Sequence, residues 1–443
     1  MRIVVIGAGY VGLAIAGGFA KLAHHVTLIE RDRARVDMIR RGQVPFHEPE
    51  MPALLAAGLR SGMLRVAETG VSAAADADIV FVAVGTPAGP DGDPDLSAVD
   101  DVVGDLARLP RLGVVALKST IPVGTTARVQ TALGARGRCA GIAYTPEFLS
   151  EGTAVADFFH PHRVIIGTAS QKAAKLLSAL YQPFHCPILV TDAATAEMTK
   201  YAANAFLATR ISFINEIAMF CERTGADVSA VAAGLGLDPR VGPHFLRAGI
   251  GFGGSCLPKD ICALRARARR DGIAPTLLDA VWEVNDAVRR AFVEKVAAVL
   301  AGLAGRTVAA LGLAFKGGTS DLRESPALDI VARLAARGAA VRAYDPAAGP
   351  WAAGLVPGLL CYGGPYEAAR GADAVLLLTD SAEFARLDWS RLRRQMRRPL
   401  ALDGRGLGLA SAAESDGFSY VGPGQSAPFL VPVAGAPLRQ VPL

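Results

Sequence analysis

The stretch of sequence best suited to covalent chemistry is GIGFGGSCLPKD, residues 249–260. Its four glycines give the backbone the freedom to wrap closely around a ligand. They lead to Cys256 at the expected start of a helix capped by Ser255, where free amides and the helix dipole favour a thiolate. Asp260 follows one turn later on the same face, within reach as a base. The pattern predicts a nucleophilic thiol, and the alternative is a buried structural cysteine.

Two further polar groups stand on a helix that the sequence predicts over residues 192–225. Apolar residues keep helical spacing for more than thirty positions, so this helix suits a spine between two domains and a dimer contact. Lys200 and Asn204 lie four positions apart on it, beside two alanines. Such a pair could face a substrate and stabilise a developing oxyanion, although a lone lysine is usually a surface residue.

A pair of carboxylates follows a short strand in the segment GIAYTPEFLSEGTAVADF, residues 141–158. If this segment is helical, Glu147 and Glu151 share one face. The alternative is the solvated start of a helix, where acidic residues are common.

The elements that would position these groups begin with a dinucleotide-binding pattern. RIVVIG is typical of a buried parallel strand, and it stops at GAGYVG, which opens an apolar-periodic helix. Gly7 permits the tight turn, Gly9 lets the backbone approach a pyrophosphate, and Gly12 allows close packing of helix on strand. The next strand, HVTLIE, ends at Glu30, which would accept from a ribose 2′-hydroxyl and repel a 2′-phosphate. The pattern predicts NAD as cofactor, a preference that Arg35 and neighbouring arginines weaken slightly; the alternative is a glycine-rich turn without a ligand.

Two more predicted strands, 77–87 and 113–126, end in small and hydroxyl residues. In an open α/β sheet the carboxyl ends of the strands line the ligand crevice. Thr86 and Thr120 are therefore site candidates, with a turn or cap role as the alternative.

The C-terminal third repeats this architecture without a GxGxxG turn. Its predicted elements are a strand at 306–316, a helix at 325–338, and strands at 341–347, 372–380 and 399–404. This order predicts a second doubly wound domain that binds a different ligand. Lys316 and Arg323 flank its first crevice and favour an anionic ligand there.

Length and composition bound the remaining possibilities. A chain of 443 residues with 51% hydrophobic residues predicts two or three domains. Six dispersed cysteines without metal spacing indicate reduced thiols in a cytosol, and neither a disulfide scaffold nor a metal site. The densest basic run, RLRRQMRR, suits a solvated helix face, so nucleic acid is not an expected partner. No glycine-poor apolar run is long enough to span a membrane.

Six segments together resemble the UDP-glucose/GDP-mannose dehydrogenase family, and its UDP-glucose 6-dehydrogenases in particular. They are GAGYVG, VGTP, KSTIPVGTT, PEFLSEGTAVADF, DPRVGPHFLRAGIGFGGSCLPKD and GLAFKGGTSDLRESPA, in the family's order from residue 1 to about 420. The block around Cys256 is the most specific, whereas GAGYVG alone is not. One departure is Glu50, where many members have glycine.

The resemblance implies that a cytoplasmic homodimer oxidises the C6 alcohol of UDP-glucose to a carboxylate. This oxidation is NAD-dependent, removes four electrons and serves the biosynthesis of UDP-glucuronate and polysaccharide. The implied fold class is α/β, with two Rossmann-like doubly wound domains joined by a long central helix and a helical middle domain. The expected boundaries are 1–190 for the NAD-binding domain, 191–300 for the central dimerisation domain, 301–425 for the UDP-binding domain and 426–443 for a tail.

The resemblance also implies roles for individual residues. Cys256 would form a thiohemiacetal and then a thioester, while Lys200 and Asn204 support the oxyanion. Asp260 and Thr120 would hold or activate water, and either Glu147 or Glu151 would assist hydrolysis of the thioester. The candidate cofactor-binding residues are Gly7, Gly9, Tyr10, Val11, Gly12, Glu30, Arg35, Thr86, Thr120, Glu151 and Arg323. The candidate substrate-binding residues are Glu147, Phe148, Leu149, Lys200, Asn204, Arg240, Phe245, Gly249, Phe252, Gly253, Cys256, Phe315 and Lys316, with Arg240 reaching across a dimer interface.

Three other functions compete with this hypothesis. The same oxidation could act on GDP-mannose or a UDP-N-acetylhexosamine. A two-electron hydroxy-acid dehydrogenase can also carry a Lys-x-x-x-Asn pair, but it leaves Cys256 and the third domain without a role. A redox-sensing NAD-binding module without turnover leaves Cys256, Asp260 and Lys200 unexplained together.

Overall fold

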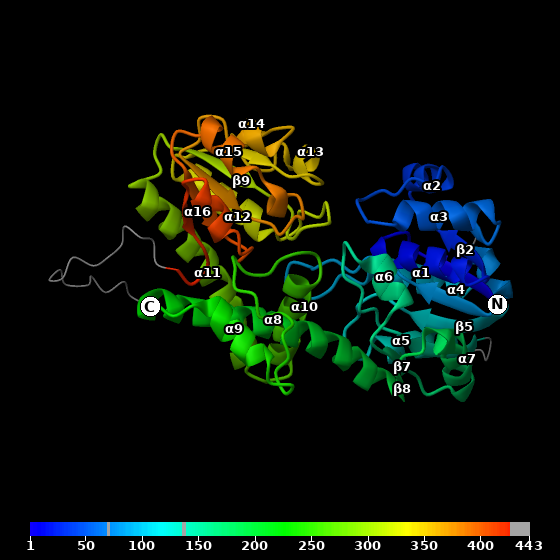
Figure 1. Ribbon diagram of the computed structural model, residues 1–443. Helices are drawn as coiled ribbons and strands as arrows, with labels where there is room; N and C mark the ends of the chain where they lie inside the picture. Colours follow the sequence, from blue (N-terminus) through cyan, green and yellow to red (C-terminus); the bar gives the residue numbers. More distant parts are fainter. Residues whose placement is uncertain (69–70, 135–138, 426–443) are drawn as a thin grey trace. The chain divides into compact units, whose positions relative to one another are not determined.

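The computed structural model of the chain describes residues 1–68, 71–134 and 139–425 (Figure 1). The predicted tail, 426–443, lies outside the described residues. The chain divides into two compact units. Unit 1 comprises Met1–Ala205 and Lys259–Pro275, and unit 2 comprises Phe206–Pro258 and Thr276–Leu443. The domain boundaries drawn from the sequence stay predictions.

Unit 1 is built on an eight-stranded sheet in the order β3-β2-β1-β4-β5-β6-β7-β8. Its strands are β1 Arg2–Ile6, β2 His25–Ile29, β3 Leu64–Ala67, β4 Ile79–Val82, β5 Leu112–Leu117, β6 Cys139–Tyr144, β7 Val164–Gly167 and β8 Ile188–Thr191. Neighbouring strands pair in parallel except β6 and β7. The first six strands have the order of a dinucleotide-binding Rossmann sheet.

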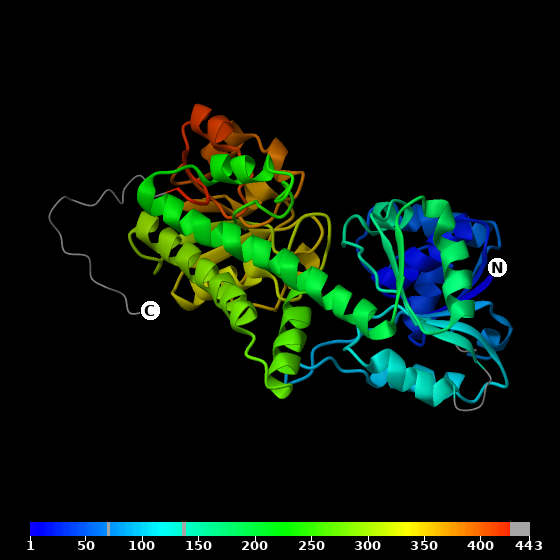
Figure 2. The same ribbon diagram turned by 90° about the horizontal axis from the view of Figure 1, so that it is seen from below.

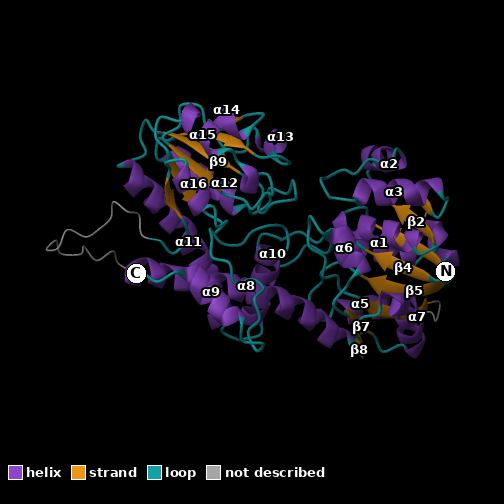
Figure 3. Ribbon diagram, in the orientation of Figure 1, coloured by secondary structure: helices purple, strands orange, loops and turns teal. Residues whose placement is uncertain are grey.

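Helices cover both faces of this sheet (Figure 3). The helices are α1 Tyr10–Lys21, α2 Arg33–Arg40, α3 Met51–Arg60, α4 Ser97–Leu106, α5 Thr125–Gly134, α6 Ala154–Phe159 and α7 Gln171–Tyr181, with 3-10 turns at Val71–Asp76 and Gln182–Phe184. Side chains of β1 alternate between two cores, because successive strand residues point to opposite faces. Ile3 and Val5 pack with α1, whereas Val4 and Ile6 pack with α4 and α5. The predicted double-sided burial of this strand is confirmed.

Unit 2 contains a six-stranded parallel sheet in the order β11-β10-β9-β12-β13-β14. Its strands are β9 Thr307–Leu311, β10 Ala340–Tyr344, β11 Leu360–Cys361, β12 Ala374–Leu377, β13 Leu400–Asp403 and β14 Ser419–Val421. The covering helices are α12 Pro326–Ala336, α13 Gly349–Ala352, α14 Pro365–Ala368, α15 Trp389–Gln395 and α16 Ala410–Ser415, with a 3-10 turn at Phe384–Arg386. This order repeats that of the first six strands of unit 1.

The long helix expected over 192–225 is α8, Ala193–Thr224, a single continuous helix (Figure 2). It begins in unit 1 and ends in unit 2. Three more helices complete the helical middle region: α9 Val228–Gly236, α10 Leu257–Arg270 and α11 Thr276–Leu300. The predicted fold class, two Rossmann-like domains with a helical middle region, is confirmed. No helix in the described residues combines the length and apolarity that crossing a membrane requires.

Glu50 keeps the backbone shape for which glycine is suited. It precedes α3 with φ of 63°, in the left-handed region. A residue with a Cβ atom pays about 1–2 kcal/mol in this conformation, which explains why glycine fits the position well.

Candidate active site

The glycine turn of unit 1 connects β1 to α1. Gly7 has a positive φ of 102°, and a Cβ atom on Gly12 would lie 1.8 Å from the Gly7 carbonyl oxygen. A Cβ atom on Gly9 would meet no atom within 4 Å, so space is open beside the first turn of α1. That turn contains no acidic residue and no side-chain cap. Its amides are therefore suited to a pyrophosphate, as the sequence predicts.

Glu30, directly after β2, is tied to this turn. Its Oε2 accepts a hydrogen bond from the Ala8 N–H at 2.9 Å, and its Oε1 accepts from the Asp32 N–H at 3.0 Å. A carboxylate has about four lone-pair sites, so it can still accept from ribose hydroxyls. Tyr10, another cofactor candidate, stacks on Phe46 with ring centroids 3.7 Å apart.

The ends of β4 and β5 are joined through the two predicted threonines. The buried Thr86 hydroxyl donates to the Thr120 carbonyl oxygen at 2.8 Å. Ser119, beside Thr120, donates to the Val84 carbonyl oxygen at 2.6 Å. Both strand ends are therefore held at the same edge of the sheet, where a ligand crevice is expected.

The carboxylates after β6 do not share a helix face, because the chain is not helical before α6 starts at Ala154. Glu147 is buried, so a solvated helix start is wrong as well. Its Oε1 lies 2.9 Å from Lys200 Nζ, and its Oε2 accepts from the Leu149 N–H at 2.7 Å. Glu151 is half-buried in the turn before α6. The structure thus brings Glu147 together with Lys200, two residues that spacing alone does not connect.

Burial alone would raise the pKa of Glu147. The attraction of Lys200, the hydrogen bonds from Lys200 and Leu149, and the charge of Lys118 together outweigh burial and lower that pKa below its ordinary value. Glu147 is therefore ionised at neutral pH and available as a proton acceptor.

Asn204 and Asp260 form the second polar pair of unit 1. Asn204 Nδ2 donates to Asp260 Oδ2 at 2.6 Å, and Lys259 Nζ contacts Asp260 Oδ1 at 2.5 Å. Asp260 is 1% exposed, in the first turn of α10. Lys200 and Asn204 thus lie one turn apart on α8, and each holds a buried carboxylate.

Cys256 lies in unit 2, directly before α10. The helix begins at Leu257, one residue later than expected, so Cys256 rather than Ser255 occupies the N-cap position. The Ser255 hydroxyl lies 3.6 Å from Cys256 Sγ. All six cysteines of the chain are thiols.

The glycines before Cys256 are required by close packing within unit 2. A Cβ atom on Gly253 would lie 2.1 Å from the Glu324 carbonyl oxygen, and one on Gly254 would lie 2.7 Å from the Phe315 ring. Gly251 has φ of 93°, and a Cβ atom there would lie 2.3 Å from Asn285 Oδ1. The loop is therefore pressed against the segment that follows β9, where Phe315 stands.

Four polar residues that sequence reasoning missed hold this loop. Asn285 accepts from the Phe252 N–H and donates to its carbonyl oxygen, and Arg289 donates to the same oxygen at 2.6 Å. Asn215 accepts from the Gly249 N–H at 2.7 Å. The signal in the sequence is an asparagine inside an apolar helix, since a polar group buried there needs a partner.

The fourth missed residue, Arg405, follows β13. Its guanidinium donates to the carbonyl oxygens of Leu378, Gly251 and Phe315. It therefore connects the Cys256 loop with the carboxyl ends of two strands.

The remaining candidates of unit 2 are more exposed. Arg323 forms a two-bond fork with Asp321, with Nη2 to Oδ2 at 2.6 Å, and Lys316 Nζ lies 5.6 Å from the Phe315 ring centroid. Arg240 is exposed and forks onto Asp238 at 2.6 Å. Phe245 is exposed, with φ of 62°.

Glu197, also missed, fixes α8 in unit 1. Its Oε1 accepts from the Thr126 N–H at 2.7 Å and the Thr126 hydroxyl at 2.6 Å, and its Oε2 accepts from the Gly124 N–H at 2.7 Å. It is fully buried at the N-terminus of α5, where a negative charge is favourable. Because Glu197 precedes Lys200 by one turn, it sets α8 against the loop that carries Thr120.

Three family models match most of the chain. They describe the NAD binding, central and UDP binding domains of the UDP-glucose/GDP-mannose dehydrogenase family, and they match residues 1–185, 194–287 and 309–408. The chain is 44% identical to a UDP-glucose 6-dehydrogenase of Pseudomonas aeruginosa, over 96% of this chain and 98% of that protein. It is 42% identical to a UDP-glucose 6-dehydrogenase of Bacillus subtilis, with the same coverage of 96% and 98%.

Solved structures show the same similarity. A UDP-glucose dehydrogenase from the hyperthermophilic archaeon Pyrobaculum islandicum has 36% identity and a TM-score of 0.89, covering 96% of this chain and 98% of its own. A UDP-D-ManNAc dehydrogenase from Pyrococcus horikoshii has 30% identity and a TM-score of 0.82, covering 96% and 100%.

Replacing Glu197 tests its anchoring role. Glu197→Ala leaves three donors without an acceptor, two of them on the buried Thr126, so we expect the free energy of unfolding to fall by about 2–4 kcal/mol. Urea denaturation followed by circular dichroism measures this change. Glu414→Ala, on an exposed face of α16, is the control and should change stability by less than about 0.5 kcal/mol. Equal effects of the two variants would contradict the anchoring role.

Proposed function

From the premise that the chain belongs to the UDP-glucose/GDP-mannose dehydrogenase family, we propose that it oxidises UDP-glucose to UDP-glucuronate. The full-length similarity to proteins named UDP-glucose 6-dehydrogenase supports this substrate. The observation that carries the chemistry is the thiol at the N-cap of α10, followed one turn later by a buried carboxylate. A two-electron alcohol dehydrogenase needs no such thiol.

NAD, when bound, accepts one hydride from C6 in each of the two oxidations. The open backbone at Gly9 and the spare acceptor sites of Glu30 fit this dinucleotide. Glu30 would bind the ribose hydroxyls, and the amides at the start of α1 would hold the pyrophosphate.

The proposed chemistry has three stages. The C6 alcohol first loses a proton and a hydride to become an aldehyde. The Cys256 thiol then adds to the aldehyde carbon, forming a C–S bond and a thiohemiacetal hydroxyl. Loss of the hydroxyl proton and of a second hydride from that carbon gives a thioester, and water releases the carboxylate and restores the thiol. Overall four electrons leave the sugar.

Residues of unit 1 would stabilise charge and move protons in these stages. Lys200 and Asn204 would donate to the oxygen on C6 as negative charge develops on it. Asp260 and Thr120 would position water. Between the two glutamates we assign hydrolysis of the thioester to Glu147, because it is buried, ionised and 2.9 Å from Lys200.

Residues of unit 2 would bind the nucleotide sugar. Phe315, Lys316 and the loop from Gly249 to Gly253 follow or face the carboxyl ends of its parallel strands, where ligands bind in such sheets. Arg323 would contact the cofactor. We place the enzyme in the cytosol, which suits its six thiols.

We also propose that the enzyme is a homodimer formed along α8. Phe206, Phe213 and Phe220 recur every seven residues on this helix and are 62%, 46% and 62% exposed. Such a stripe on a long helix is typical of a helix–helix interface and is unfavourable in water. A second copy would cover the stripe and bring the exposed Arg240 to its partner's substrate.

The stoichiometry of oxidation tests the function. With UDP-glucose and excess NAD, we expect two NADH to form for each sugar consumed. The absorbance of NADH measures this ratio when enough enzyme is present to consume all of the sugar. Cys256→Ser should stop turnover or stall it after the first oxidation, whereas the control Cys361→Ser should still give two. One NADH per sugar, unaffected by Cys256→Ser, would make Cys256 structural. No NADH with UDP-glucose, but two per GDP-mannose or UDP-hexosamine, would reassign the substrate.

Disrupting the phenylalanine stripe tests the dimer. Phe213→Asp places a charge in the proposed interface, so the species measured by analytical ultracentrifugation should change from dimer to monomer. Trp351→Asp removes an even more exposed apolar side chain outside α8 and should leave the dimer intact. A natural chain that sediments as a monomer at micromolar concentration would contradict the proposal.

A further inference from the structure

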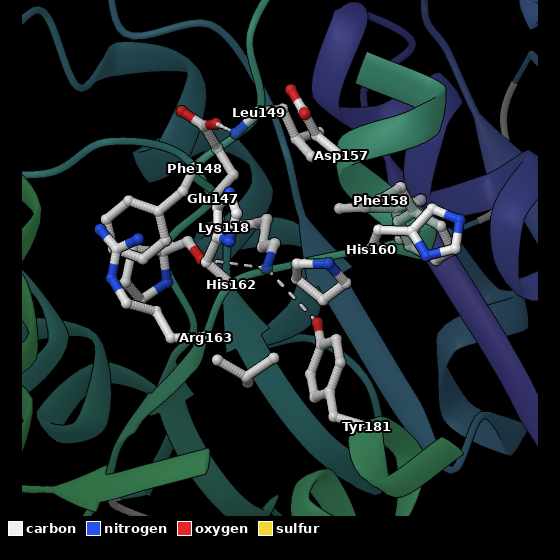
Figure 4. Close-up of a pocket in the computed structure, with 14 residues that line it drawn as sticks. Lys118, Glu147, Phe148, Leu149, Asp157, Phe158, His160, His162, Arg163 and Tyr181 are labelled. Atoms are coloured by element: carbon white, nitrogen blue, oxygen red, sulfur yellow. Dashed lines mark hydrogen bonds between the residues drawn. The ribbon is translucent and has the colours of Figure 1, made fainter. Parts of the chain in front are cut away.

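A cavity of about 80 Å³ lies beside the Glu147 loop in unit 1 (Figure 4). Its charged and titratable lining consists of Lys118, Glu147, Asp157, His160, His162 and Arg163, together with the phenol of Tyr181. Lys118 directly follows β5 and precedes Thr120 by two residues. No part of the proposed function uses it.

Lys118 is buried against the segment that carries Glu147. Its Nζ donates to the Pro146 carbonyl oxygen at 3.2 Å and to Tyr181 Oη at 3.3 Å, and it lies 5.4 Å from the Tyr181 ring centroid (Figure 4). Both hydrogen-bond partners are neutral. The Pro146 carbonyl belongs to the peptide bond that joins Pro146 to Glu147. Lys118 therefore fixes the backbone that carries Glu147, the partner of Lys200.

Burial lowers the pKa of Lys118 to about 7; Glu147 opposes this change, and the like charge of Lys200 adds to it. The other charged groups around the cavity have partners of their own. Asp157 accepts from the Ser150 N–H and the Thr153 hydroxyl, and Arg163 stacks 3.7 Å from the Phe148 ring centroid. His160 and His162 also line the cavity. The gain or loss of a proton on Lys118 therefore acts mainly on Glu147 and Lys200.

We infer that Lys118 is a positioning residue of the reaction, because it fixes the Pro146–Glu147 peptide. Its protonation state also determines how strongly the ionised forms of Glu147 and Lys200 are favoured. This inference rests on the proposed dehydrogenase function. A charged Lys118 repels the positive charge of Lys200, whereas a neutral Lys118 does not oppose the attraction between Lys200 and Glu147. The positive charge of Lys200, which would stabilise an oxyanion, is then more favourable, so activity should rise as Lys118 loses its proton.

Two substitutions fix opposite protonation states. Lys118→Met is neutral at every pH, and Lys118→Arg stays charged throughout the measured range. We would measure kcat at saturating UDP-glucose and NAD from pH 6 to pH 8.5, and divide each value by that of the natural chain. For Lys118→Met the ratio of the two kcat values should rise about tenfold as the pH falls towards 6. Tenfold is the change that a shift of one unit in the pKa of a neighbouring group produces. For Lys118→Arg the ratio should fall about tenfold towards pH 8.5.

The exposed Lys172→Met is the matched control and should give a ratio near one throughout. Tyr181→Phe removes a neutral acceptor of the ammonium group, so it should shift the pH-dependent step to lower pH without abolishing it. A merely structural role of Lys118 predicts ratios that do not vary with pH, and that result would overturn the inference.

Stability gives a readout that needs no turnover. The pKa of Lys118 is about 7 in the folded chain, below the ordinary lysine value of 10.5 that applies to the unfolded chain. Below pH 7 both states are charged, and the folded state bears the full cost of the buried charge; as pH rises from 7 to 10.5 that cost disappears. The melting temperature of Lys118→Met minus that of the natural chain should therefore fall as pH rises from 6 to 9.5. A difference in melting temperature that stays constant with pH would contradict a buried charge on Lys118. A difference that falls with pH, in a chain that does not oxidise UDP-glucose, would instead contradict the proposed function.

Discussion

The ion pair between Glu147 and Lys200 is the constraint on which the candidate active site of unit 1 depends. The two side chains are 7% and 3% exposed, and their atoms lie 2.9 Å apart. Removing one partner of such a pair leaves a buried charge and costs about 3–5 kcal/mol, so the loop after β6 and helix α8 must stay together. Glu197 and Asn204, at positions −3 and +4 from Lys200, extend this contact along one face of α8. One helix face thus joins α5, the Glu147 loop and α10 through buried carboxylates.

The thiol is positioned by different means. In unit 2 the loop before Cys256 requires glycine at three positions. A Cβ atom on Gly251, Gly253 or Gly254 would clash with Asn285, Glu324 or Phe315, respectively. The side-chain amide of Asn285 and the guanidinium of Arg405 then form hydrogen bonds with the backbone of this loop. The groups proposed to transfer protons and the thiol proposed to form a covalent bond have different requirements. The charged groups need strong partners, whereas the thiol needs a backbone that can approach a ligand closely.

Much of this could be read from the sequence, because strand and helix periodicity is local. Sequence patterns predict the GAGYVG turn, the strand that ends before Glu30 and the long helix α8. The six strands of unit 2 repeat the order of the first six strands of unit 1. The sequence could not show that Glu147 meets Lys200, since 53 residues separate them and the segment after β6 is a loop rather than a helix. Glu197 and Arg405 were missed for a similar reason: each acts on backbone groups far along the chain, and neither lies in a recognised motif. Lys118 begins the KSTIPVGTT segment, but nothing in that segment shows that its side chain reaches the Pro146 carbonyl oxygen.

The central claim is that the sugar is carried on Cys256 as a thioester, and trapping that species tests it most directly. In Glu147→Gln the amide oxygen can still accept a hydrogen bond from Lys200, so the loop should stay in place, and hydrolysis should slow while the earlier stages continue. After mixing with UDP-glucose and NAD, acid quenching and peptide mass spectrometry should find the uronosyl nucleotide bound to the Cys256 peptide on most of the protein. Finding no adduct while NADH is formed, or an adduct on another cysteine, would contradict the account.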